Sequence, residues 1–138
     1  MTSTELKALA TAYMQVWNAG NTHILDTHAH EDLTVDYTHF EKPYRKISDY
    51  KNMLETTWKY FPDLTISLHA VIPNEDSVTV IWEYAGTHKY GTLFGVEASG
   101  KQISVKGMTL LEVENNLVKK ESGIVDNFSM LMQLGAMG

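Results

Sequence analysis

The stretch from residue 64 to residue 84, LTISLHAVIPNEDSVTVIWEY, decides the fold. Apolar residues recur at every second position on both sides of a turn at residues 73–76, and this period is typical of strands with one buried face. Residues 103–113 repeat the pattern, and the pair Asn115-Asn116 marks a tight turn before a returning strand at residues 117–125. We therefore predict a long antiparallel sheet in the second half of the chain.

The half of the chain before this sheet shows helical spacing instead. Thr2 and Glu5 form a capping box, and apolar residues then recur every three or four positions as far as Trp17. Ser48 is the expected N-cap of a third helix, which Pro62 ends. The other expected elements are helices at residues 3–17, 22–29, 49–60 and 128–134 and a short strand at residues 33–37.

This order of elements predicts one α+β domain over residues 1–138, with three N-terminal helices packed on a strongly curved, mainly antiparallel sheet and a short C-terminal helix. A twisted sheet wrapped around helices makes a cone, and the open end of a cone is a natural pocket. The outer face of the sheet stays uncovered, and we expect it to form a homodimer interface. To this outer face we assign Ile103, Val105, Thr109, Leu111 and Val113.

The composition excludes several classes of function. The 138 residues include no cysteine, which removes disulfides, thiol catalysis and cysteine-ligated metals. The formal net charge of −6, from 17 acidic and 11 basic residues, repels a phosphate backbone, so we expect no nucleic-acid partner. No apolar run approaches the roughly 20 residues that cross a bilayer, and the N-terminus lacks a signal-peptide pattern. We expect a cytoplasmic protein with no membrane contact.

An ordered set of short motifs spans nearly the whole chain. Trp17-Asn18-Ala19-Gly20 ends the first helix, Phe61-Pro62-Asp63-Leu64 precedes the sheet, and Gly86-Thr87-His88 follows Trp82. Further motifs are Phe94-Gly95, Gly100-Lys101, and Asp126 followed by Gln133-Leu134-Gly135. Together these resemble the SnoaL-like polyketide cyclase family of the NTF2-like superfamily, and the resemblance implies an NTF2-like cone with a mainly apolar cavity.

The chain also departs from the pattern of that family. Family members usually have a tryptophan four residues before the terminal aspartate, where this chain has Ser122. They often have Gly-Lys in the last turn, where this chain has Asn116-Leu117. The arginine that the family has in the third long strand is absent, and Arg45 is the one arginine of the sequence. The substrate can therefore differ even where the fold is shared.

Asp126 is the first candidate for catalysis. The resemblance implies that this residue is the general acid/base of an aldol-type ring closure. A carboxylate in an apolar pocket is poorly solvated, so its pKa rises towards the working pH, as proton transfer requires. The alternative is a helix cap, because Asp126 directly precedes the last expected helix and its side chain can accept backbone N–H groups there.

Two histidines are further candidates. His39 follows the first short strand, close to the expected mouth of the cavity, and a neutral histidine can donate or accept a proton near neutral pH. His88 continues the inward-facing alternation of Trp82 and Tyr84. The structural alternative for both is a partly buried histidine bonded to a backbone carbonyl. We favour this alternative for His88, and it stays open for His39.

Large apolar side chains are candidates for the wall of the cavity, because aromatic rings and flexible methionines suit flat apolar ligands. Ordinary core packing is the competing interpretation for each of them. Tyr13 and Tyr84 could in addition donate a phenol hydrogen to a substrate oxygen. The candidate wall residues are Trp17, Trp58, Phe61, Trp82, Tyr84, Met108 and Met130.

His28 and His30, beside Glu31 and Asp32, offer the ligand types that metals use. Residues two apart on a helix point in different directions, so the cluster presents no common ligand face. We expect neither a metal nor a cofactor.

Three functions stay open at this stage. The first is an enzyme that uses Asp126 for acid/base chemistry, of the aldol-cyclisation or isomerisation type, on a small hydrophobic carbonyl compound. The second is a non-catalytic binder of hydrophobic small molecules. The third is a dimeric scaffold like other members of the NTF2-like superfamily.

Overall fold

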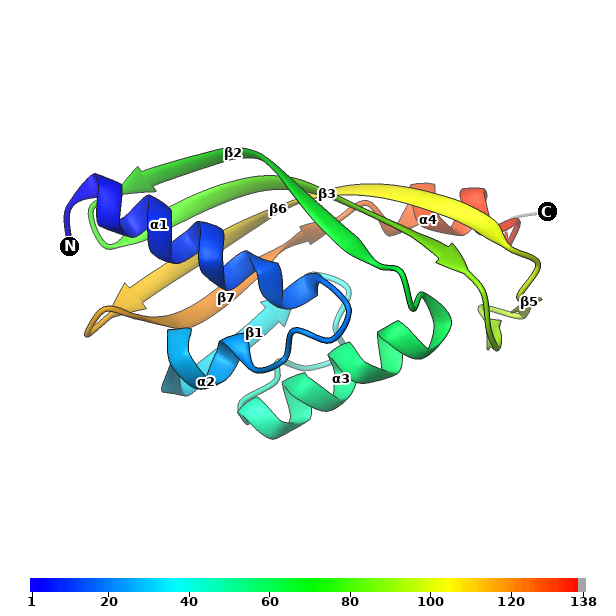
Figure 1. Ribbon diagram of the computed structural model, residues 1–138, viewed down its shortest axis with the longest axis horizontal. Helices are drawn as coiled ribbons and strands as arrows, with labels where there is room; N and C mark the ends of the chain where they lie inside the picture. The colour runs from blue at the N-terminus through cyan, green and yellow to red at the C-terminus, as the bar shows by residue number, and fades with distance from the viewer. Residues whose placement is uncertain (137–138) are drawn as a thin grey trace.

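Apart from one short hairpin, helices and strands follow one another as the sequence pattern predicts, in a computed structural model that describes residues 1–136 (Figure 1). Residues 137 and 138, the end of the predicted domain, lie outside the described residues. The helices are α1 (Ser3–Met14), continued by a 3₁₀ turn (Gln15–Trp17), α2 (Ile24–His28), α3 (Ile47–Tyr60) and α4 (Asn127–Leu134).

The capping box that opens α1 is present. Thr2 Oγ1 accepts from the Glu5 N–H at 3.1 Å, and the Glu5 carboxylate accepts from the Thr2 N–H at 2.9 Å. The predicted cap of α3 is wrong, because Lys46 occupies the N-cap position and Ser48 lies inside the helix. Lys46 is extended there and offers no side-chain cap bond, so the local propensity of Ser48 did not fix where the helix starts.

The main sheet has the strand order β1-β7-β6-β3-β2. Neighbours pair antiparallel, except that β1 runs parallel to β7 and so joins the first strand of the chain to the last strand of this sheet. The strands are β1 (Ala29–Tyr37), β2 (Thr65–Asn74), β3 (Ser77–His88), β6 (Lys101–Glu114) and β7 (Leu117–Val125). A small hairpin of β4 (Thr92–Leu93) and β5 (Val96–Glu97), which the sequence did not predict, connects β3 to β6.

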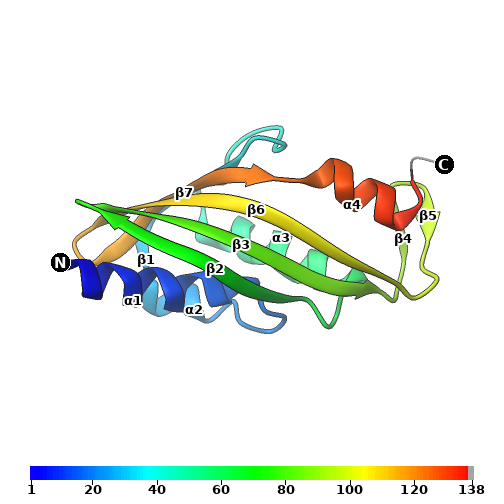
Figure 2. The same cartoon turned by 90° about the horizontal axis from the view of Figure 1, so that it is seen from above.

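Helices α1, α2 and α3 lie on the concave side of the curved sheet, and α4 lies at its far end beside the β4–β5 hairpin (Figures 1 and 2). The core therefore sits between the three N-terminal helices and the sheet. The α+β class and the cone-like arrangement predicted from the sequence are confirmed. No helix within residues 1–136 is long and apolar enough to cross a membrane.

The two faces of β6 are the reverse of the prediction. Val105 pairs with Tyr84 and Leu111 pairs with Val78, and all four side chains are buried against the helices. Ile103 and Thr109 are likewise buried, and Val113 is half-buried. The outer face instead carries the exposed residues Met108, Leu110 and Ile124. The exposed set of β6 also includes Lys106, Glu112 and Glu114. The alternation therefore separated the two faces correctly, and only their assignment to the inside and the outside was wrong.

Candidate functional site

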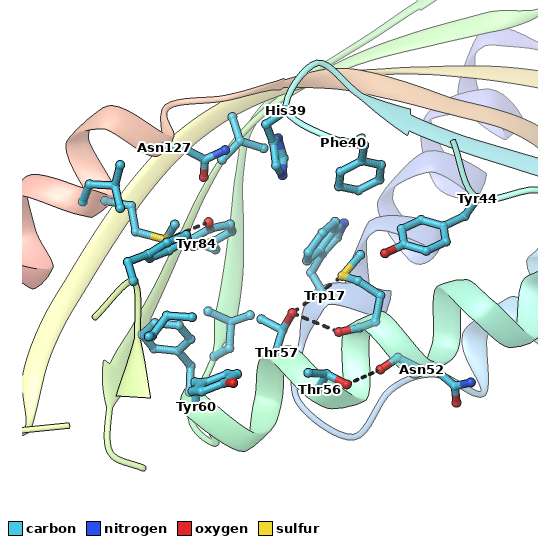
Figure 3. A pocket seen from close by; sticks show the side chains of 18 of the residues that line it. Trp17, His39, Phe40, Tyr44, Asn52, Thr56, Thr57, Tyr60, Tyr84 and Asn127 are labelled. Carbon is cyan, nitrogen blue, oxygen red and sulfur yellow. Dashed lines mark hydrogen bonds between the residues drawn. The ribbon is translucent and has the colours of Figure 1, made fainter. Parts of the chain in front are cut away.

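A pocket of about 720 Å³ opens between α3, α4 and the loop that follows β1 (Figure 3). Its walls are mostly aromatic and aliphatic, with a few polar side chains among them. The lining residues are Trp17, His39, Phe40, Tyr44, Asp49, Asn52, Met53, Thr56, Thr57, Tyr60, Phe61, Leu64, Tyr84, Leu93, Phe94, Val125, Asn127, Met130 and Leu131.

Trp17 is held inside this wall by other aromatic rings. Its ring stacks on Tyr84 at a centroid distance of 6.3 Å and on Trp82 at 6.5 Å. Trp82 itself lies over Gly107 across the β3–β6 pair, where a Cβ atom would come within 2.3 Å of the indole. A glycine at 107 therefore makes room for the stack that places Trp17 beside the pocket.

Tyr84 of β3, Asn127 of α4 and His39 of the loop after β1 are polar side chains of the pocket that can meet a ligand. Tyr84 is buried, and its hydroxyl donates to the Met130 sulfur at 3.7 Å. A thioether is a weak acceptor, so a better acceptor such as a carbonyl oxygen can replace it. Burial raises the pKa of Tyr84 to about 12, so the phenol keeps its proton at neutral pH.

His39 stands at the mouth of the pocket and is largely exposed. Its ring packs against Phe40 at a centroid distance of 4.8 Å and against Tyr37 at 6.2 Å. This partial burial lowers the pKa of His39, because it disfavours the charged imidazolium. His39 is therefore a neutral imidazole at neutral pH, able to accept a proton.

Further polar residues of the wall lie on α3, and two of them, Thr56 and Thr57, are hydrogen-bonded within that helix. Thr56 donates to the Asn52 carbonyl at 2.8 Å, and Thr57 donates to the Met53 carbonyl at 3.0 Å. Their hydroxyls are turned to the helix backbone, as Figure 3 shows for both. These two hydroxyls are therefore already engaged and are not free to meet a ligand.

Asp126, the leading candidate from the sequence, is the N-cap of α4. Its side chain is exposed and accepts from the Ser129 N–H at 3.1 Å. Its neighbours Val125 and Asn127 line the pocket, but Asp126 does not. The expectation of a desolvated cavity carboxylate is wrong, and the helix-cap alternative describes the geometry.

The other predicted site residues divide between the pocket and the core. Trp17, His39, Phe61, Tyr84 and Met130 line the pocket. His88 is buried, with Nε2 at 2.9 Å from the Gly91 carbonyl oxygen, which confirms the structural interpretation.

Three tryptophan and methionine candidates for the wall do not line this pocket. Trp58 lies outside it and donates to the Trp17 carbonyl at 3.2 Å. Met108 is half-exposed on the outer face of the sheet, because its neighbour Thr109 is the residue of β6 that points inward at this position. Trp82 is buried behind Trp17.

Tyr13 belongs to a second polar cluster, centred on Glu121, at the closed end of the cone. Glu121 is fully buried, and three phenols donate to its carboxylate. Tyr13 donates to Oε1 at 2.7 Å, Tyr37 donates to Oε2 at 2.5 Å, and Tyr50 bridges both oxygens at 2.9 and 3.0 Å. Burial raises the pKa of Glu121, and the three phenol hydrogen bonds oppose that shift.

The hydrogen bonds of this cluster continue to Thr109. Trp82 Nε1 donates to Thr109 Oγ1 at 2.8 Å, and Thr109 Oγ1 lies 2.8 Å from the Tyr37 hydroxyl. Because Tyr37 donates to Glu121, Thr109 donates to Tyr37. Each hydrogen in this series of hydrogen bonds then points towards the Glu121 carboxylate. The ionised form of Glu121 therefore provides an acceptor for every donor in the series. A protonated Glu121 would be a further donor with less acceptor capacity, inside a cluster made of donors.

Little in the sequence indicates this cluster. An irregularity in the β6–β7 pairing places one extra residue of β7 between Val118 and Lys120, so Val118 and Glu121 are both buried although they lie three positions apart. Alternation counted forward from Val118 assigns Glu121 to the outer face. One usable signal was the set of inward-facing tyrosines on three different elements, because buried phenols need an acceptor.

The histidine and carboxylate cluster near residue 30 is divided between two elements, because His28 ends α2 whereas His30, Glu31 and Asp32 lie in β1. His30 lies in β1, its Nδ1 accepts from the Asp32 N–H at 3.0 Å, and its Nε2 lies 3.5 Å from a Glu114 carboxylate oxygen. Among residues 1–136, no three side chains of histidine, cysteine, aspartate or glutamate gather closely enough to hold a metal ion.

A curved, mainly antiparallel sheet with three helices on its concave side and a pocket near its far end defines a cone-shaped NTF2-like protein. The sequence model of the SnoaL-like polyketide cyclases matches residues 7–134. The chain therefore belongs to the SnoaL-like polyketide cyclase family.

Solved structures with the same fold come from several bacteria. A candidate polyketide cyclase from Acidithiobacillus ferrooxidans is similar with a TM-score of 0.86 and 24% sequence identity, over 100% of this chain and 99% of that chain. AclR from Streptomyces galilaeus is similar with a TM-score of 0.84 and 22% sequence identity, over 97% of this chain and 98% of that chain. TsrD from Streptomyces laurentii is similar with a TM-score of 0.84 and 20% sequence identity, over 99% of this chain and 98% of that chain. At these identities the likeness concerns the fold. Among curated proteins, none matches the sequence.

Proposed function

We propose that the protein binds a small, mainly apolar carbonyl compound in the pocket beside Trp17 and moves a proton on it. His39 accepts a proton from the carbon next to the carbonyl group. Tyr84 donates a hydrogen bond to the carbonyl oxygen as negative charge develops there, and Asn127 is placed to do the same from α4. The observation that supports this most is the pocket of about 720 Å³, whose mainly apolar wall contains these polar groups.

The chemistry follows from the environments of these groups. Enolisation needs a base that is neutral in the resting state and a donor aimed at the developing oxyanion. The lowered pKa of His39 keeps its imidazole unprotonated, and the raised pKa of Tyr84 keeps its phenol protonated. The base and the donor therefore hold the required protonation states at the same pH.

Asp126 contributes indirectly in this proposal. Its cap bond to Ser129 fixes the first turn of α4, which carries Asn127 and Met130 into the wall. Asparagine is about as good a helix cap as aspartate, so the variant D126N is expected to keep its activity. A complete loss of turnover in D126N would restore Asp126 as the base.

The test uses 2-tetralone, a neutral bicyclic ketone, and follows the exchange of its α-hydrogens in D₂O by NMR. The wild type is expected to accelerate the exchange, and H39A to lose about 100-fold or more of that acceleration. H23A is the matched control, because His23 is exposed at the start of α2, outside the pocket lining. Equal rates for H39A and the wild type would contradict the role of His39.

A second function, binding without catalysis, is favoured by the position of the carboxylates. Asp49 is the one carboxylate among the described residues of the lining, and it lies exposed on the first turn of α3. A pure binder would be stabilised against heat by 2-tetralone and would leave its α-hydrogens unexchanged. Stabilisation together with exchange would exclude this alternative.

We also propose that the protein self-associates. The interface differs from the one expected from the sequence, because other residues are exposed on the outer face of the sheet. Met108, Leu110 and Ile124 expose apolar surface on adjacent strands β6 and β7. We expect a homodimer through this face, and the single change I124E is expected to yield a monomer in sedimentation velocity. A monomeric wild type at micromolar concentration would contradict the interface. The cytoplasmic location also stays a prediction.

A further inference from the structure

Glu121 lies directly behind the wall of the pocket. Trp17 lines the pocket, and its ring meets Tyr37 edge-on at a centroid distance of 6.1 Å and Tyr50 at 6.3 Å. Both of these tyrosines donate to the Glu121 carboxylate. Within residues 1–136, the buried indole N–H of Trp17 has no hydrogen-bond partner of its own, yet it is near enough to Glu121 to favour the ionised form. One aromatic side chain therefore separates this carboxylate from the pocket.

No cation compensates Glu121 in its hydrogen-bonding shell. Within residues 1–136 its partners come from α1, β1 and α3 and are the neutral phenols of Tyr13, Tyr37 and Tyr50. The titratable groups that face the carboxylate from the described elements are these phenols, and each has its pKa raised, by burial first and then by Glu121 itself. Burial raises the pKa of Glu121; at a pH above that pKa, the cluster holds a net negative charge in the interior of the protein.

The pocket itself offers no positive charge to an anion. Among the described residues, its lining contains neither lysine nor arginine, and its one formally charged residue at neutral pH is Asp49. Lys42, Arg45 and Lys46 lie exposed on the loop between β1 and α3, outside the lining. Exposed charges are screened by salt, whereas a buried charge acts through low-dielectric surroundings and is screened much less.

We propose that Glu121 is a specificity-determining residue, whose buried charge acts across Trp17 to reject anionic ligands and admit neutral or cationic ones. The inference rests on the proposed function of the pocket and narrows its substrate class. A carboxylate or phosphate group inside the pocket would face Glu121 across one ring, without a compensating cation. The natural ligand is therefore a neutral ketone or ester, or an amine, rather than a free acid.

Three ligands of nearly equal shape test this proposal, namely 2-acetonaphthone (neutral), 2-naphthoate (anionic) and 2-naphthylmethylammonium (cationic). Dissociation constants are measured by calorimetry at pH 8.5 in about 0.3 M salt, where the Debye length is about 6 Å and rim charges are screened. In the wild type, 2-naphthoate is expected to bind at least about tenfold more weakly than 2-acetonaphthone, and the cation at least as tightly.

The variant E121Q keeps the size of the side chain and removes its charge. In this variant the dissociation constants of the neutral and the anionic ligand are expected to differ by no more than about threefold, because the repulsion between the Glu121 charge and the anion is lost. A merely structural role would change the affinity for all three ligands alike and leave their ratios unchanged. The control E112Q removes an equal charge from the exposed outer face, where Glu112 pairs with Lys120 at 3.8 Å, and is expected to keep the wild-type ratios.

If E121Q fails to fold, measurements on the wild type alone can still overturn the inference. Equal affinity for 2-acetonaphthone and 2-naphthoate would overturn the specificity role while leaving the pocket proposal standing. No binding of any of the three ligands would overturn the pocket proposal and this inference with it. An NMR titration that finds Glu121 protonated at pH 8.5 would also overturn the inference, since no charge would then lie behind Trp17.

Discussion

The two ends of the cone treat polar groups in opposite ways. At the closed end, Glu121 and its phenol partners are buried and joined by hydrogen bonds of 2.5–3.0 Å. At the open end, Tyr84 donates to a sulfur atom at 3.7 Å, and His39 stands exposed at the mouth. Trp17 lies between the two regions and is packed against rings of both.

This difference separates what holds the fold from what is available for chemistry. A buried polar group with all its partners contributes to a unique packing, and its loss is costly. A polar group with a weak partner in a pocket costs the fold little and can exchange that partner for a ligand. The closed end is therefore expected to respond to mutation in stability, and the open end in ligand binding.

The largest effect is expected from E121A. Removing the carboxylate leaves three buried phenol hydroxyls without their acceptor, and we expect the free energy of unfolding to fall by about 3–5 kcal/mol. H39A, at the open end, is expected to change it by no more than about 0.5 kcal/mol. Urea denaturation of both variants measures the contrast. A similar loss in the two variants would remove the distinction between the ends.

Two tyrosine variants, Y13F and Y84F, compare the two ends of the cone by removing one phenol oxygen from each. Y13F removes a 2.7 Å bond to Glu121, and we expect a loss of about 2 kcal/mol in the free energy of unfolding, since hydrogen bonds to charged groups contribute about 1.5–3 kcal/mol. Y84F removes a weak bond to sulfur and is expected to cost about 0.5 kcal/mol or less. Y84F should instead reduce the rate at which the protein exchanges the α-hydrogens of 2-tetralone. Y13F is expected to reduce this rate less.

The cap of α4 gives a smaller effect. D126A loses the side-chain bond to the Ser129 N–H and is expected to cost about 1 kcal/mol, whereas D126N keeps an acceptor and is expected to cost a few tenths. Thermal unfolding of the two variants distinguishes them. Equal stability of D126A and the wild type would mean that the cap bond contributes nothing in solution.

The smallest expected effect is a dependence of stability on pH. Because burial raises the pKa of Glu121 in the folded protein above its usual 4.5, the folded state binds the proton more tightly than the unfolded state. The contribution of this group is therefore greatest below the unfolded pKa and is lost as the pH rises through the folded pKa. The stability of the wild type relative to E121Q should decline from pH 4.5 upwards, as urea denaturation can measure. A relative gain in stability over that range would contradict the raised pKa.

The order of elements was predictable because its signals are local. The capping box at Thr2 and Glu5, the proline at 62 and the alternation through Trp82 each specify a structure through neighbours in the sequence. The starting point of α3 was less predictable, since Ser48 has the right propensity for an N-cap but the helix starts at Ile47, without a side-chain cap bond. The alternation in β6 separated its two faces correctly, but the apolar face was assigned to the outside although it packs against the helices.

The candidate site was predictable only in its apolar part. Trp17, Tyr84 and Met130 follow from periodicity, because inward-facing apolar residues near an open end form its wall. Glu121 was missed, since its burial depends on an extra residue in the β6–β7 pairing and on partners from three distant elements. Asp126 was placed correctly at the start of the last helix, but only the three-dimensional structure tells that its side chain turns to Ser129.

The cluster at the closed end also has a consequence for the order of folding. Its three phenols belong to the first fifty residues, whereas their acceptor follows 108, 84 and 71 positions later. A ribosome that has made α1, β1 and α3 has therefore exposed the donors long before β7 supplies the carboxylate. Contacts of such long range slow folding. The parallel pairing of β1 with β7 is thus expected to close last, and until then the nascent N-terminal half carries three phenols that still lack their acceptor.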